Sequence, residues 1–188
     1  HEAGYRTIHA GKAHFGALKT AAANPKGIGF DVNIAGHAPG GPASYYGTRN
    51  FAVNPGKPGE NVWDIPGLEA YHGQDIFLTE ALTLEANKAI DAAVADKQPF
   101  FFYMAHYAIH VPILPDPRFV DNYKGIPKVE AAYASLIEGM DKRSRRLVFW
   151  SILLAIFLGI TASLWTVVRA HAETKVSRAP ESRKICIF

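Results

Sequence analysis

Cysteine and net charge are both scarce in this sequence. Its 188 residues include a single cysteine, Cys186, so no disulfide can form within the chain and a cysteine-rich zinc site is excluded. Lys and Arg number 20 against 17 Asp and Glu, a formal net charge of +3, and much of the surplus follows Asp141. The main body therefore has no strongly basic face, and no zinc-finger, helix-turn-helix or RNA-binding motif is present. We predict no nucleic-acid partner.

A signal peptide is also missing from the sequence as it stands, since no basic and then apolar segment follows His1. A long apolar run occurs near the other end instead. Residues 147–168 carry no charge, follow the basic sequence KRSRR, and include Trp150 and Trp165 near the two ends of the run. About 20 apolar residues suffice to cross a bilayer, so we predict a single hydrophobic, transmembrane-like helix and a membrane contact there. A buried core helix is the alternative.

Composition divides the chain into four parts. Residues 1–142 mix apolar, polar and turn-forming residues as a globular domain does. We interpret residues 143–146 as a basic linker, 147–168 as the hydrophobic helix, and 169–188 as a polar, disordered tail.

The pattern of residues 1–142 predicts an α/β fold. Alternating and β-branched residues predict a strand at 5–10, and the segment 27–36, bounded by glycines, is the second strand candidate. The unbroken aromatic run at 100–105 is typical of a central parallel strand covered on both faces. Residues 36–67 are rich in Gly and Pro, which predicts a long irregular loop of the kind that often carries function.

Two amphipathic helices are expected. Apolar residues at helical spacing predict one helix at 79–96, with Thr79 as its N-cap and Pro99 beyond its end. A second helix is expected at 128–141, after Pro127. Its predicted buried face comprises Val129, Ala132, Tyr133, Leu136, Ile137 and Met140.

Lys12 and His14 follow the first predicted strand, between Gly11 and Gly16. In an extended segment, residues two apart point to the same face, so the ammonium and the imidazole can converge on one anionic group. The two glycines allow close approach of the backbone. The alternative is a surface lysine beside an ordinary turn histidine.

His106 and His110 follow the aromatic strand. Because sites in open α/β sheets form at the carboxyl ends of strands, we expect these histidines near Lys12 and His14. A histidine in that place can protonate a leaving oxygen as a general acid. For His106, a structural role with a hydrogen bond to the backbone is the alternative.

Four segments, in order along the chain, resemble the sulfatase family. GYRTIHAGKAHFG (residues 4–16) is similar to the family's G-Y-x-T-x-x-x-G-K-W-H-x-G segment, and PFFFYMAHYAIHVPI (99–113) to its P-F-F-x-Y strand and following H-x-P loop. GLEAYHGQDIFLTEALTLEANKAI (67–90) resembles the segment where a loop near the substrate ends and a helix begins. YASLIEGMD (133–141) is similar to the next helix of the family. The resemblance covers about residues 1–142, which we interpret as a partial sulfatase catalytic domain.

The resemblance implies part of an alkaline-phosphatase-like α/β/α sandwich that hydrolyses sulfate esters, such as those of sulfated glycans. In the family the nucleophile is a formylglycine, made from Cys or Ser in a C/S-x-P/A-x-R motif and held beside a calcium ion. By resemblance, Lys12 contacts the sulfate and the nucleophile, and His14 supports the nucleophile hydroxyl. His110 contacts the ester and is the candidate acid, and His106 is a further candidate for substrate binding. The family's usual export implies a periplasmic, extracellular or membrane-associated protein.

The sequence also departs from the family pattern at several functional positions. Ala13 replaces a tryptophan, which removes a packing ring but no chemistry. The nucleophile motif is absent, because Cys186 is followed by neither proline nor arginine, and the family's calcium-binding aspartates and D-N-G segment are absent too. We therefore expect an internal fragment of the catalytic domain that is inactive alone, with no metal ligand identified. A phosphoester hydrolase of the same superfamily and a non-catalytic, membrane-anchored remnant are the alternatives.

Overall fold

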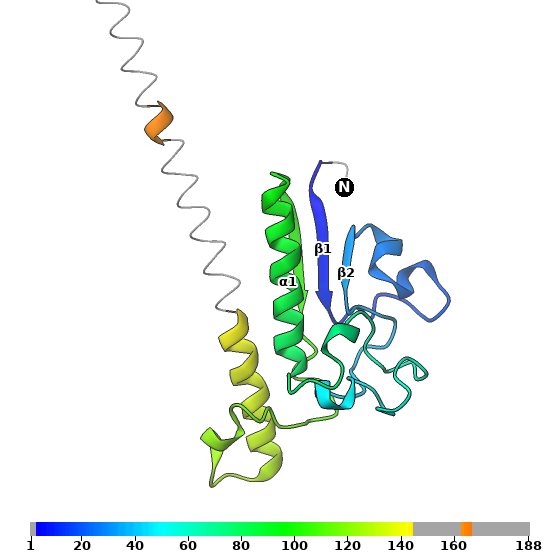
Figure 1. The fold of residues 1–188 in the computed structure, drawn as a ribbon, viewed down its shortest axis with the longest axis vertical. Coiled ribbons are helices and arrows are strands. Elements are labelled where there is room, and N and C mark those ends of the chain that lie inside the picture. The colour runs from blue at the N-terminus through cyan, green and yellow to red at the C-terminus, as the bar shows by residue number, and fades with distance from the viewer. Residues whose placement is uncertain (1–2, 145–162, 167–188) are drawn as a thin grey trace, which may run out of the picture. The chain divides into compact units, whose positions relative to one another are not determined.

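A three-stranded parallel sheet forms the centre of the protein (Figure 1). The structure is a computed structural model that describes residues 3–144 and 163–166. The strands are β1 (Arg6–Gly11), β2 (Val32–Ile34) and β3 (Phe100–Ala105), in the order β2-β1-β3. Parallel strands joined through a long helix confirm the predicted α/β fold.

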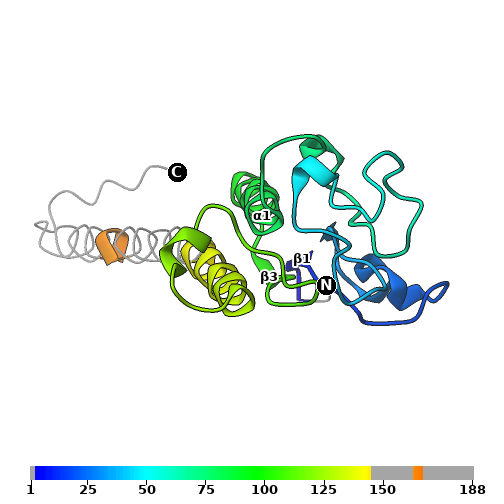
Figure 2. The same cartoon turned by 90° about the horizontal axis from the view of Figure 1, so that it is seen from below.

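Helix α1 (Leu78–Ala95) covers one face of the sheet, as Figures 1 and 2 both show. Its predicted apolar stripe is confirmed, since Leu82, Ala86 and Ala93 are fully buried. The predicted N-cap is wrong, because Phe77 occupies that place and Thr79 is buried inside the first turn. The helix begins at Leu78, one residue before the predicted start, because the Leu78 N–H donates to the Tyr45 carbonyl at 2.8 Å.

Strand β3 lies at an edge of this sheet, which corrects the expectation of a central strand covered on both faces. Its even-numbered side chains and Ile8 of β1 belong to the core beneath α1. Its odd-numbered side chains face the other way, and Phe101 and Tyr103 remain 53% and 43% exposed. Within the described residues β1 is the central strand, and no helix covers the second face of β3.

A second helix begins at residue 128 and continues to residue 144, the last described residue of this part (Figure 1). The predicted face is wrong at Val129, Tyr133 and Ile137, which are exposed. Small residues face inward instead, because the helix packs closely against the buried Asp116, whose N–H donates to the Ser135 hydroxyl at 2.9 Å. The buried positions are Ala131, Ala132, Ser135, Leu136 and Gly139.

Arg118 joins the second helix to α1. Its guanidinium donates to the buried Asp116 and, at 2.6 Å, to Glu80 in the first turn of α1. Arg143 of the second helix also contacts Glu80. Removing one partner from such a half-buried charge cluster leaves the others uncompensated, so the cluster fixes the start of α1.

The connection between β2 and α1 is the predicted irregular loop. It buries Tyr45 and Phe51 completely and carries only short helical turns. The 3-10 turns of the described chain are η1 (Ala21–Ala23), η2 (Pro25–Ile28), η3 (Gly47–Arg49), η4 (Glu69–Tyr71) and η5 (Val120–Tyr123).

The predicted hydrophobic helix at 147–168 lies outside the described residues, except for residues 163–166, which are helical and exposed. The predicted tail, 169–188, lies wholly outside them. In the part of the chain that the structure describes, no helix combines the length and apolarity needed to cross a bilayer. Residues 3–144 belong to one compact unit.

Strands β1 and β3 approach each other closely at Gly11, and this contact can be tested by substitution. A methyl group on Gly11 would lie 1.9 Å from the Ala105 carbonyl oxygen, and Gly11 has φ +98°. Gly29 has a similar φ of +107° but open space around it. In urea titrations we expect Gly29→Ala to lower the free energy of unfolding by about 1–2 kcal/mol through backbone strain. Gly11→Ala should lower it by about 1–3 kcal/mol more through overpacking. Equal losses in the two variants would contradict the contact.

Candidate functional site

His14 and His110 line one cavity of about 550 Å³. His14 follows β1 and His110 follows β3, while Ala38, Pro39 and Gly40 reach the cavity from the loop after β2. The three segments leave the same edge of the sheet, as expected for the carboxyl ends of parallel strands. The remaining lining residues are Phe15, Gly16, Ala17, Leu18, Val62 and Trp63.

Two consecutive glycines hold the two imidazole rings. A Cβ at Gly40 would lie 2.6 Å from Nδ1 of His14, and one at Gly41 would lie 2.6 Å from Nδ1 of His110. Both glycines are buried. Any larger residue would therefore displace a ring. Sequence reasoning missed this pair, although the Gly-Gly between two prolines was a visible signal.

The backbone and ring of His110 are fixed by hydrogen bonds. Its ring Nδ1 lies 2.9 Å from the Val111 carbonyl, and its N–H donates to the Tyr107 carbonyl at 2.8 Å. Because a carbonyl oxygen only accepts, Nδ1 carries a hydrogen there, which leaves Nε2 as the nitrogen that can serve a ligand.

Two buried tyrosines support the loop that carries His110. The Tyr45 hydroxyl lies 2.8 Å from the carbonyl oxygens of both Tyr107 and His110, which share its single hydrogen. The Tyr107 hydroxyl lies 2.8 Å from both the Ala35 carbonyl and Nδ1 of His37. Burial raises the pKa of both phenols, so they stay protonated and able to donate at neutral pH. Neither tyrosine was predicted from the sequence.

Lys12 is held by its backbone at the end of β1. Its N–H donates to the Ala105 carbonyl at 2.7 Å, and Nε2 of the buried His9 lies 3.3 Å from its carbonyl. Strand β1 ends at Gly11, and His14 has a left-handed φ of 56°, so the two-apart argument for an extended segment does not apply. Within residues 3–144, Lys12 is not among the residues lining the His14–His110 cavity. Its contact with sulfate stays a prediction.

His106 lies away from that cavity, against the second helix. Its Nε2 is 3.2 Å from the Ser144 hydroxyl, and its Nδ1 is buried with no hydrogen-bond partner among the described residues. Burial lowers the pKa of His106 to about 4, so its ring is neutral at pH 7. Substrate binding by His106 likewise stays a prediction.

Comparison with known proteins identifies the family of this chain. The Sulfatase family model matches residues 1–148. The chain belongs to the sulfatase family. It is 25% identical over 142 residues to arylsulfatase J of Mus musculus, a match that covers 75% of this chain and 23% of that protein.

Two solved structures are similar to this sulfatase chain. They are the crystal structure of Ps i-CgsB and that of Ps i-CgsB in complex with k-i-k-neocarrahexaose. Each aligns with a TM-score of 0.59 and 27% identity over 78% of this chain and 34% of that chain. The sulfatase chain therefore spans about a quarter to a third of the relatives it matches.

Calcium, which the family implies, finds no set of ligands in the described part of this sulfatase chain. Among residues 3–144 and 163–166, no group of three or more His, Cys, Asp or Glu side chains could hold a metal ion. The donors at the His14–His110 cavity are imidazoles, whereas calcium prefers oxygen ligands. The residues present do not fit the ion, and we derive no step through it.

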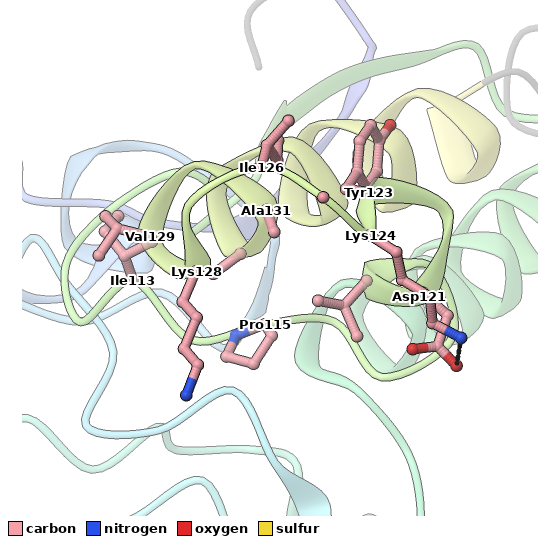
Figure 3. Close-up of a pocket in the computed structure, with 12 residues that line it drawn as sticks. Ile113, Pro115, Asp121, Tyr123, Lys124, Ile126, Lys128, Val129 and Ala131 are labelled. Atoms are coloured by element: carbon pink, nitrogen blue, oxygen red, sulfur yellow. Dashed lines mark ion pairs between the residues drawn. The ribbon is translucent and has the colours of Figure 1, made fainter.

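A larger cavity of about 640 Å³ lies between the second helix and the segment that leads into it (Figure 3). Apolar side chains such as Ile113 and Val129 form much of its wall, and Figure 3 shows the Asp121–Lys124 ion pair away from them. That pair is 3.5 Å long and highly exposed, so it contributes little stability. Within residues 3–144 no histidine lines this cavity, and we assign it no sulfatase chemistry.

Burial of His106 predicts a pH-dependent stability. The folded pKa of about 4 lies below the usual value of 6.5, so the unfolded chain binds the proton more readily between these values. Stability should therefore fall as pH drops from about 6.5 towards about 4. His106→Leu, which cannot be protonated, should show a smaller fall in the free energy of unfolding between pH 7.5 and pH 5 than the unchanged chain. An identical fall in both proteins would exclude His106 as a cause.

The Tyr45 hydroxyl can be tested against a matched neighbour. Tyr46 donates to the Pro115 carbonyl at 2.8 Å, whereas the Tyr45 hydroxyl contacts the His110 carbonyl. Tyr45→Phe and Tyr46→Phe should each lower the free energy of unfolding by about 1 kcal/mol. Only Tyr45→Phe should shift the ring resonances of His110 in a ¹H–¹⁵N NMR spectrum. A similar shift in Tyr46→Phe would show a general loss of packing instead.

Proposed function

We propose that this chain forms the sulfate-ester-binding part of a sulfatase catalytic domain. The observation that carries the proposal is that His14 and His110, from two strand ends, line one cavity and rest on adjacent glycines. Membership of the sulfatase family supports the same conclusion. In the longer protein, we propose, the present sheet is part of an α/β/α sandwich, and calcium is held by residues beyond those described here.

The proposed chemistry uses the histidines for two tasks. His14 donates a hydrogen bond that supports the attacking hydroxyl. His110 in its protonated form gives the Nε2 proton to the ester oxygen as the sulfur–oxygen bond breaks, and an alcohol leaves. Nδ1 of His110 is already occupied by the Val111 carbonyl, so Nε2 is the nitrogen available for this transfer. Lys12 adds positive charge that stabilises the anionic group in the transition state.

Sulfated glycans are the substrate class we propose. The complex of Ps i-CgsB with k-i-k-neocarrahexaose supports a glycan, because that relative is 27% identical over most of this chain. Phosphate esters remain the second candidate within the superfamily, since a phosphate is also a tetrahedral oxyanion.

We further propose that this chain binds sulfate without turning over an ester. The C/S-x-P/A-x-R motif that supplies the family's nucleophile does not occur in the sequence. Binding needs only the donors around the cavity, whereas hydrolysis also needs a group to attack sulfur.

Titration of the 188-residue chain with sodium sulfate tests the proposal. We expect the ring resonances of His14 and His110 to shift saturably, while those of His106 stay in place as an internal control. 4-Nitrophenyl sulfate should release no more phenol than it does with Lys12→Ala. A parallel titration with sodium phosphate compares the affinity of the site for the two anions. Unmoved His14 and His110 resonances would remove the sulfate site, and phenol release above the Lys12→Ala level would refute the missing nucleophile.

A further inference from the structure

Residues 38–42, with the sequence Ala-Pro-Gly-Gly-Pro, form what we term the glycine segment. It follows His37, whose carbonyl accepts the N–H of His14 at 3.3 Å. It ends before Ala43, whose N–H donates to the Trp63 carbonyl at 2.8 Å. The glycine segment is thus fastened at both ends and runs along the His14–His110 cavity between them.

Within residues 3–144, the peptide N–H groups of the glycine segment have no hydrogen-bond partner. Its two prolines carry none, which leaves the N–H groups of Ala38, Gly40 and Gly41. All three residues are buried, and none of the three N–H groups is hydrogen-bonded to another described residue. Most peptide N–H groups in buried residues have a hydrogen-bond partner, so three unpaired ones in one short segment leave donors free for an acceptor.

The surroundings of the glycine segment favour an anion as that acceptor. Ala38 and Gly40 line the cavity with His14 and His110. Gly40 and Gly41 touch those two rings. Successive backbone N–H groups form anion-binding concavities elsewhere in proteins, and they act most strongly where water is excluded.

We propose that the glycine segment is part of the anion site: the N–H groups of Ala38, Gly40 and Gly41 donate to the oxygens of the sulfate ester, and the missing side chains of Gly40 and Gly41 set the positions of His14 and His110. This inference rests on the proposed function and adds to it. The two glycines act both as ligands, through the backbone, and as positioning residues for the imidazoles.

Backbone amide resonances of the unchanged 188-residue chain test the ligand role directly. Sodium sulfate, added against sodium chloride at matched ionic strength, should move the amide protons of Ala38, Gly40 and Gly41 downfield. The Gly56 amide is the control, because it lies in the same loop but already donates to the Asn54 side chain at 3.1 Å. Its resonance should stay in place.

Alanine variants test the positioning role. Gly40→Ala should move the His14 ring resonances most, and Gly41→Ala those of His110, since each methyl group meets only one ring. Each variant should weaken sulfate binding about tenfold or more, because the displaced imidazole no longer donates to the anion in the same place. Gly56→Ala meets nothing nearer than 3.5 Å and should bind sulfate as the unchanged chain does.

The outcomes separate this inference from the proposed function. Ring shifts at His14 and His110 without amide shifts in the glycine segment would overturn the inference and leave the sulfate site intact. Amide shifts without ring shifts would support the glycine segment and overturn the role of the histidines. If neither moves, both proposals fail. The amide measurement on the unchanged chain decides the matter even where an alanine variant fails to fold.

Discussion

The whole site depends on how closely β1 and β3 approach at their carboxyl ends. A Cβ at Gly11 would lie 1.9 Å from the Ala105 carbonyl oxygen, so a side chain there forces the two strands to shift. That approach lets the Lys12 N–H pair with Ala105 one residue later. Strands β1 and β3 then end side by side at the same edge of the sheet. The segments that carry His14 and His110 therefore begin as neighbours, although they are far apart in sequence. If the two strands moved apart at Gly11, the segments that carry His14 and His110 would move apart as well.

Two buried tyrosine hydroxyls connect the loops that follow the strands. A loop that passes through an apolar core brings backbone carbonyls that must be hydrogen-bonded there. Tyr45 and Tyr107 reach those carbonyls from inside the core, where shorter polar side chains would not, and their rings fill the space between. The loop after β2 and the loop after β3 are thereby joined to each other and not only to the sheet. This explains how an irregular segment can hold the glycine segment in a fixed position.

Local signals in the sequence are sufficient to predict the strands, helix α1 and the edge of the sheet where the His14–His110 cavity lies. They failed where a distant partner decides the outcome. Thr79 looked like a cap, but the Tyr45 backbone holds Leu78 and starts the helix earlier. The second helix turns small residues inward because Asp116 is buried beneath them, and nothing in its own periodicity reveals that. The role of the glycine pair was equally hidden, since the rings it touches come from two other strand ends.

Burial separates the histidines into two kinds. An imidazole that gives a proton to an ester oxygen must recover it from water, so it needs an open path to solvent. His14 is exposed and His110 is only partly buried, and both border a cavity. Burial lowers the pKa of His37 and of His106 to about 4, which keeps both rings neutral and suited to packing and hydrogen bonding. His106 and His110 follow the same strand four residues apart, yet one faces the second helix and the other the cavity. The direction in which the chain leaves β3, rather than the residue type, therefore decides which histidine can take part in acid–base chemistry.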